Sequence, residues 1–463
     1  MQKKLLTAAV ASVLAAPCIA LAQTAASVEV YGTVYPTFGH VKYGDGFAAR
    51  DTNVATGAAV ASATIPSMSK FDVQAPSSNF GVRGRESLGA GLTAWFQIEQ
   101  NAPLEREATQ SVTVASRNSA AGVQGGWGNV FVGQWTTPWA DLDSLWAIGQ
   151  VSVFGPVTTL IGRRESTGVS PNPASARNQA CATTIIAPGG TGAPSANTTP
   201  QCDAVVGAGG VGHAFWRRAS DMIRYTSPSF SGLTFDAMYQ VPELKTVGIS
   251  SGVNYTAEPS MMSTSLKWSG MGGRARVGAA IDRHKDFTSI GKTDSGYAIK
   301  GGFNFGVVDI GAAYENLTYK CGSFNSTPAQ VAAAPVGVTL ASATAGADLP
   351  TLCRTEGDVK NKTWSLAASV PVGIGAIKAF YAKTSDMTGA IGVGDTGAKM
   401  FGLGYDHRFS KRTSLGVEYT KIDNSRNAQF TWTGMPPTQT GASNTPSFGV
   451  DVTWVFVGMV HRF

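Results

Sequence analysis

The chain repeats one short arrangement: an alternating strand, a tight glycine-rich turn, a second alternating strand and a longer polar segment. One copy, residues 78–100, reads SNFGVRGRESLGAGLTAWFQIEQ. Its second half carries Phe96 and Ile98 on one face, whereas its first half carries Arg83 and Arg85 on the other. Successive side chains of a strand point to opposite faces, so an alternation with period two indicates a strand between two different solvents.

Seven such hairpins with short turns occur along the chain. Apart from the copy just quoted, their turns are expected at residues 125–128, 228–232, 270–273, 305–306, 371–375 and 410–412. One further strand at each end of this series, at 27–38 and 453–463, brings the number of strands to sixteen. An even number of strands with both ends on the short-turn side fits a closed transmembrane barrel. Closure is required because an open strand edge in lipid would leave backbone groups without hydrogen-bond partners.

The fold class predicted is therefore all-β, a 16-stranded antiparallel transmembrane β-barrel with short periplasmic turns and long extracellular loops. A soluble sandwich or β-helix would show a similar alternation in each strand, so the period alone does not decide. The composition favours the membrane, because only 14% of residues are charged, compared with about a quarter in soluble domains. Aromatic residues at strand ends suit the interfacial girdles of a barrel, and they include Tyr239, Tyr314, Tyr381 and Tyr419.

The N-terminal segment, residues 1–22, has the pattern of a secretory signal peptide. Lys3 and Lys4 precede a short apolar run that ends in small residues, and we expect cleavage after Ala22. The run is too short to anchor a protein in a bilayer of roughly 30 Å hydrocarbon thickness. Residues 23–463 are then expected to form a single barrel domain.

The segments between hairpins are long and polar and are expected on the extracellular side. The first is predicted at 37–77 and the third, much the longest, at 136–216. Four cysteines fall in these loops, and disulfides are expected in an exported chain. Local pairing is the simplest of three connectivities, all of which remain open. These cysteines are Cys181, Cys202, Cys321 and Cys353.

No catalytic or metal-binding pattern accompanies these strands. The five histidines lie in separate segments, and no GxSxG, HExxH or phosphate-loop motif is present. No CxxC motif or neighbouring histidine accompanies the cysteines. The formal net charge of +6 is mild and contains no Lys/Arg runs, which argues against nucleic-acid binding and fits attraction of anions better. We therefore expect neither an enzyme nor a cofactor or metal.

Three segments resemble the Gram-negative general porins, particularly the basic, arginine-lined group. They are FGVRGRESLGAGLTAWFQIEQ, RYTSPSFSGLTFDAMY and the ending VGMVHRF, and the similarity touches nearly every hairpin. The resemblance implies a homotrimer in the outer membrane of a Gram-negative bacterium, with a water-filled channel for passive diffusion of small hydrophilic solutes and ions. It implies that the third loop folds into the pore. It also implies that outer-membrane lipid and lipopolysaccharide surround the barrel. It also implies that Phe463 ends the signal read by the barrel-assembly machinery.

Charged residues in the third loop and on the barrel wall are the candidates for a constriction. The loop offers the acids Asp141, Asp143 and Glu165, and the wall opposite would offer Arg83, Arg85 and Arg224. Opposite charges across a narrow passage create a transverse field that orients water and polar solutes. Alternatively, the two arginines of the first hairpin are solvated lumen residues near the rim, and the two aspartates cap a short helix.

Three further arginines are less certain from the pattern. Arg117 is attractive by its position in the family, but the alternation around it does not assign it to a face. Arg217 and Arg218 could anchor the return of the third loop to the barrel. A mild anion preference is the expected selectivity, and a solute-specific channel or a surface-adhesion barrel with long loops remain the alternatives.

Overall fold

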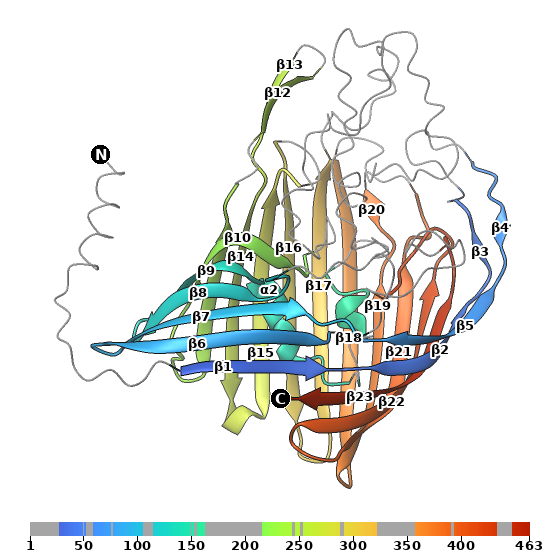
Figure 1. Ribbon diagram of the computed structural model, residues 1–463. Coiled ribbons are helices and arrows are strands. Elements are labelled where there is room, and N and C mark those ends of the chain that lie inside the picture. The colour runs from blue at the N-terminus through green and yellow to red at the C-terminus, as the bar shows by residue number, and fades with distance from the viewer. Residues whose placement is uncertain are drawn as a thin grey trace.

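The predicted strands close into one barrel in the computed structural model of the protein (Figure 1). The structure describes residues 27–49, 51, 59–75, 77–104, 114–149, 151, 155–162, 215–242, 246–250, 253–287, 291–321, 357–389, 393–432 and 447–463. The expected signal peptide, Glu165, Cys181, Cys202 and Cys353 lie outside the described residues, as does the side chain of Cys321. The disulfides therefore stay a prediction.

The sheet contains nineteen strand segments, which make up sixteen barrel strands. β1 (Ser27–Val34) and β2 (Thr37–Tyr43) are two halves of one strand, since both pair with β23 (Val452–Arg462). β5 (Met68–Gln74) and β6 (Asn79–Gly89) are likewise the two halves of its neighbour. β20 (Thr388–Gly389) is a short addition beside β18.

The other barrel strands follow in chain order, each antiparallel to the next. They are β7 (Leu92–Asn101), β8 (Ser119–Gly125), β9 (Gly128–Thr136), β10 (Arg218–Thr226), β11 (Leu233–Gln240), β14 (Ser260–Gly270), β15 (Ala275–Lys285), β16 (Thr293–Asn304), β17 (Asp309–Cys321), β18 (Gly357–Val372), β19 (Gly375–Thr384), β21 (Ala398–Arg408) and β22 (Thr413–Asn424). The predicted 16-stranded antiparallel barrel is confirmed.

Seven short turns lie at the rim of the barrel where β1 begins and β23 ends, and longer segments join the strands at the other rim (Figure 1). At the β6–β7 turn, Gly89 and Gly91 have φ values of 81° and 77°, which glycine adopts at little cost. Two small hairpins stand in the long loops. The first loop holds β3 (Gly46–Phe47) and β4 (Thr64–Ile65), and the fourth holds β12 (Thr246–Ser250) and β13 (Val253–Ala257).

The outer surface of the barrel is apolar. Leu266, Ile281 and Leu403 point outward and are about half exposed, as expected of side chains that meet lipid instead of water. Aromatic rings neighbour one another across strands on this face, for example Trp364 and Tyr381 with centroids 5.3 Å apart. This is the arrangement of an interfacial girdle. In the described part of the chain, no helix is long and apolar enough to cross a bilayer.

The predicted first loop, 37–77, is wrong at both ends, because β2 and β5 continue the barrel wall through it. In β2 the pattern is inverted: Val41 and Tyr43 point inward and are fully buried, whereas Lys42 points outward and is exposed. The inversion arises because this part of the barrel interior is itself apolar. The expectation that apolar residues face outward therefore excluded β2, whereas β5 follows it, with Phe71 and Val73 exposed on the outer face.

Candidate functional site

The third loop enters the barrel as a short helical segment after β9. It forms α2 (Pro138–Asp141), then η1 (Leu142–Leu145) and, further on, η2 (Pro156–Thr158). Thr137 is the N-cap residue of α2, and its hydroxyl accepts a hydrogen bond from the Ala140 N–H at 3.2 Å. Proline at the first helical position also favours a helix start here, because its missing N–H would have no partner anyway.

The loop then follows the inner wall of the barrel. α2 contacts β14 and β15, η1 contacts β15 and β16, and η2 contacts β19. Glycines on the wall allow this close approach. A Cβ atom on Gly311 of β17 would lie 2.0 Å from the Trp146 carbonyl oxygen, and one on Gly416 of β22 would lie 2.2 Å from Val151 Cγ1. The loop backbone thus lies directly on the wall.

Asp141 is fixed to the wall by a partly buried ion pair. Its Oδ2 lies 2.6 Å from Arg224 Nη2, which also lies 2.7 Å from Asp236 Oδ1 of β11. Lys267 of β14 completes the group at 2.8 Å from Asp236. The Arg224 side chain is only 4% exposed. Arg224 therefore points inward as predicted, but it contacts Asp141 directly, so the expectation that it faces this acid across the passage is corrected.

Asp143 connects the beginning of the third loop to the barrel wall and to the end of the same loop, just before β10. Lys300 of β16 lies 2.8 Å from Asp143 Oδ1, and the indole N–H groups of Trp146 and Trp216 donate to the same carboxylate. Neither Asp143 nor Asp141 makes a side-chain capping bond, because Thr137 takes that role. The capping interpretation of the two aspartates is thus wrong.

The end of the loop meets its beginning at Arg217. The Thr137 N–H donates to the Arg217 carbonyl oxygen at 3.1 Å. The Arg217 guanidinium is buried, with its central carbon 4.9 Å from the Phe287 ring centroid. Burial lowers the pKa of Arg217 to about 10, so it remains charged at neutral pH. Both observations fit the predicted role of this arginine in anchoring the loop.

An apolar cluster holds the middle of the third loop inside the barrel. Trp146, Leu160 and Ile161 of the loop are fully buried against wall side chains and against the eighth loop, between β22 and β23. The wall residues include Val41, Tyr43, Met400, Ile422, Trp454 and Phe456, and the eighth loop adds Phe430, Trp432 and Val450. Side chains therefore fill the barrel interior on the side of β19 to β23.

Arginines lie on a different part of the wall, on β6. Arg83 and Arg85 alternate with outward-facing Phe80 and Val82, so they face the interior. Arg83 forms an ion pair of 2.8 Å with Glu29, which stands directly opposite on β1. Arg85 is exposed and has no ion pair with a carboxylate of the described residues. Half of the Arg83 side chain surface is exposed, so these charges are accessible to water.

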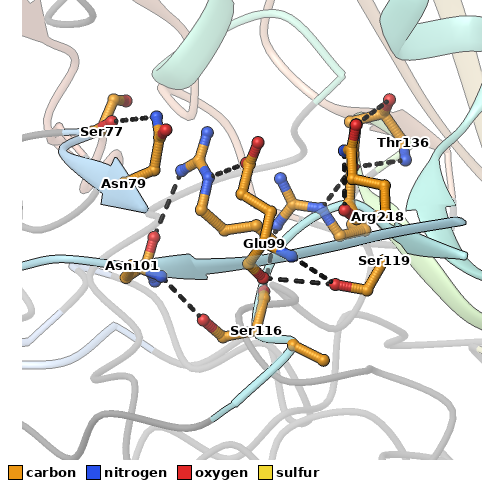
Figure 2. Close-up of polar contacts among 12 residues, drawn as sticks. Ser77, Asn79, Glu99, Asn101, Ser116, Ser119, Thr136 and Arg218 are labelled. Atoms are coloured by element: carbon orange, nitrogen blue, oxygen red, sulfur yellow. Dashed lines mark hydrogen bonds and ion pairs between the residues drawn. The ribbon is translucent and has the colours of Figure 1, made fainter. Parts of the chain in front are cut away.

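A second polar group continues this wall toward the long loops, and Figure 2 shows it. Arg117 forms an ion pair with the inward-facing Glu99 of β7 and donates to Asn101 Oδ1 at 3.2 Å. The Tyr31 hydroxyl donates to the other Glu99 oxygen at 3.0 Å. Arg218 lies beside this group and donates to Asn118 Oδ1 at 2.7 Å. Arg117 thus lies on the same, inward-facing side of the wall as Glu99. The sequence pattern had left this face open.

We define the basic wall as Arg83, Arg85 and Arg117 with their carboxylate partners Glu29 and Glu99. Sequence reasoning missed both carboxylates. The register of β1 against β6 was the signal for Glu29, since it lies opposite Arg83. The part of the third loop that the structure describes is fixed to other strands, from β10 to β22. That Arg83 and Arg85 form a constriction with the third loop stays a prediction.

Metal or cofactor binding finds no support in this part of the molecule. Within the described ranges, no group of three or more His, Cys, Asp or Glu side chains could hold a metal ion. The carboxylates of Asp141, Asp143 and Asp236 are occupied by arginine, lysine and indole partners. The chemistry that the arrangement offers is electrostatic: fixed charges beside water.

Comparison with known proteins gives matches over nearly the whole chain. A family model described as Gram-negative porin matches residues 7–427. Outer membrane porin protein 32 of Delftia acidovorans is 24% identical over 470 residues, which cover 100% of both chains. The structure of the anion-selective porin from Comamonas acidovorans superposes with a TM-score of 0.58 at 21% identity, covering 95% of this chain and 100% of that one. The in-vitro folded OmpT of Vibrio cholerae, in its trimer form, gives 0.52 at 15% identity, covering 95% and 100%.

Proposed function

The chain belongs to the family of Gram-negative porins, and from this premise we propose that its water-filled passage prefers anions to cations. As a porin it resides in the outer membrane and lets small hydrophilic solutes and ions diffuse passively through the barrel. The family and the fold are those of channel proteins. The proposal includes no catalytic activity.

The charge balance of the basic wall carries the proposal. Three guanidinium groups, of Arg83, Arg85 and Arg117, stand against two carboxylates, of Glu29 and Glu99, which leaves one positive charge uncompensated. The charges that fix the third loop are, by contrast, largely paired with one another. The excess positive charge therefore lies on the side of the barrel where β6 and β7 stand.

A fixed positive charge beside a hydrated passage raises the local concentration of anions and lowers that of cations. The effect is moderate when water separates the charge from the ion, because water screens the interaction. One uncompensated charge thus fits a mild preference and leaves cations able to pass. The printed description of the Comamonas acidovorans protein as anion-selective supports the same direction.

Two further features belong to the proposal. The protein assembles as a homotrimer, which the trimer form of the Vibrio cholerae relative supports. Arg83, Arg85 and the acids of the third loop act together at the narrowest part of the passage, because the loop occupies the interior beside β10 to β22 and so narrows the passage. Glu165 would take part from the same loop.

The zero-current potential across a planar bilayer tests the proposed selectivity. The purified protein is reconstituted between KCl solutions of different concentration, and the sign of the potential reports which ion passes more easily. We expect the sign that shows easier passage of chloride, with a chloride-to-potassium permeability ratio of a few-fold. A potential of the opposite sign would refute anion preference, and the absence of conductance would favour a surface-adhesion barrel.

A further inference from the structure

One row of residues crosses the inner wall of the barrel from β6 to β10 and combines charged and aromatic side chains. Trp95 of β7 stands opposite Arg85 on one side and Gly122 on the other. Phe131 of β9 stands opposite both Gly122 and Arg224. Residues that stand opposite each other in a sheet point to the same face, so the two rings face the barrel interior together with the two arginines.

The aromatic side chains of this wall form one continuous group. The ring centroids of Trp95 and Phe131 lie 5.3 Å apart, as do those of Phe131 and Trp135, and those of the two tryptophans lie 5.9 Å apart. Gly122 leaves room for them, because a Cβ atom there would lie 2.5 Å from Phe131 Cβ. The Trp95 indole N–H donates to Asn129 Oδ1 at 2.9 Å, which fixes the orientation of the ring. We name Trp95, Phe131 and Trp135 the aromatic ledge.

Part of the aromatic ledge is accessible from the passage. Phe131 is buried in an apolar cluster with Met222 and Met238, whereas Trp95 and Trp135 lie at the edge of this cluster and are only partly buried. The planes of Phe131 and Trp135 make angles of 59° and 75° with that of Trp95, so neither ring stacks flat on it. The interior of a porin barrel is in general polar and hydrated. Trp95 therefore offers aromatic surface to solutes in that water.

The charge beside this aromatic surface is positive. The Cβ atoms of directly opposed residues lie about 5 Å apart, so Arg85 and Trp95 can contact one small molecule together. At the other end of the row, Arg224 is occupied by Asp141 and Asp236. Arg85 is exposed and has no ion pair with a carboxylate of the described residues. Its guanidinium group can therefore bind a carboxylate from solution through two parallel hydrogen bonds.

We propose that Trp95 and Arg85 form a binding site for small aromatic carboxylates that diffuse through the passage. The carboxylate group of the solute pairs with Arg85, and its ring packs on Trp95 in the offset or edge-to-face geometry that aromatic pairs favour. The positive charge selects an anion, and the ring surface selects a planar aromatic anion over a saturated one. The inference rests on the proposed function, because the anion preference brings carboxylates to the basic wall.

Interruption of the ion current by added benzoate tests the site. Single-channel recording in a planar bilayer gives the benzoate concentration that reduces the KCl current by half. Cyclohexanecarboxylate is the matched probe, because it has the same charge and ring size but no aromatic character. We expect wild type to bind benzoate roughly three- to tenfold more tightly than cyclohexanecarboxylate. Equal binding of the two probes by wild type would overturn the proposal.

Substitutions of Trp95 and Arg85 separate the roles of ring and charge. Trp95→Leu should remove the preference for benzoate, whereas Trp95→Phe, which keeps a ring without the indole N–H, should retain part of it. Arg85→Gln should weaken the binding of both probes by the same factor. Discrete conductance steps show that each variant is folded. An unchanged preference in Trp95→Leu, or a loss of binding in Arg85→Gln for one probe alone, would refute the site.

Trp268→Leu is the matched control, since Trp268 of β14 lies on the outer face of the barrel and is partly exposed there. It should keep the wild-type preference for benzoate, and an equal loss in this variant would show that benzoate acts through the bilayer and refute the site. The two probes carry the same charge, so the ratio of their affinities is separate from the zero-current potential of wild type. A potential that favours potassium would refute the proposed anion preference, whereas equal binding of the two probes would refute this inference alone.

Discussion

Phe463 and Gly32 exchange two backbone hydrogen bonds. The Gly32 N–H donates to the Phe463 carbonyl oxygen at 3.2 Å, and the Phe463 N–H donates to the Gly32 carbonyl oxygen at 3.1 Å. A Cβ on Gly32 would lie 2.5 Å from Phe463 Cζ, so the aromatic ring covers this glycine. The pair completes the seam between the first and last strands and gives Phe463 a structural role besides its proposed part in barrel assembly.

Replacement of Phe463 by alanine should reduce the amount of folded barrel, because it removes the ring that covers the seam. We expect folded protein, measured by its heat-dependent mobility in gel electrophoresis, to fall several-fold in isolated outer membranes. Phe409→Ala is the control, since Phe409 is an exposed aromatic residue in the short turn between β21 and β22. Similar yields for the two variants would refute a special role of the seam.

Asp143→Asn should destabilise the third loop, since it leaves the buried ammonium of Lys300 without its carboxylate. Loss of one partner of a buried ion pair costs about 3–5 kcal/mol. The free energy of unfolding in urea, in lipid vesicles, measures this cost. The double variant with Lys300→Met should lose less than the sum of the single variants, because it leaves no unpaired charge. Additive losses would show that the two residues act independently.

Gly311→Val should push the third loop away from the wall, because the added atoms would meet the Trp146 carbonyl oxygen. We expect a change in single-channel conductance together with a loss of stability of about 1–3 kcal/mol. Ala312→Val is the matched control, as Ala312 is exposed on the outer face of the same strand. A wild-type conductance in Gly311→Val, or an equal change in the control, would contradict the path assigned to the loop.

Arg85→Gln should weaken the anion preference, because it removes a basic-wall charge that has no carboxylate partner among the described residues. We expect the chloride-to-potassium permeability ratio to fall roughly by half at 0.1 M salt. The difference from wild type should shrink at 1 M salt, where the screening length drops from about 10 Å to about 3 Å. Lys411→Gln, in a turn outside the passage, should leave the permeability ratio unchanged. An equal effect of this variant would show that selectivity depends on the net charge of the protein and not on the basic wall.

The barrel could be predicted from the sequence because lipid imposes one rule on most of its strands. Leu266, Val417 and their equivalents all face the same apolar solvent, so the alternation is regular and countable. The rule failed at the end of β2, where Val41 and Tyr43 pack into an apolar cluster inside the barrel. Nothing in that segment alone shows which face meets lipid.

The candidate site was only partly predictable, since a loop path and cross-strand partners depend on three-dimensional packing. The inward direction of Arg83 followed from alternation, but its pairing with Glu29 required the β1–β6 register. Asp143 was recognised as a charged residue of the third loop, whereas its partner Lys300 lies far along the chain. Gly311 carries no pattern at all until the loop is seen to lie against it.

Single-channel recording in a planar bilayer tests whether this barrel encloses a water-filled passage with an excess of positive charge on one wall. We expect discrete conductance steps in KCl whose zero-current potential favours chloride, and a weaker preference for chloride after removal of Arg85. Purified, folded protein that inserts without producing steps would contradict the passage, and steps that favour potassium would contradict the charge assignment.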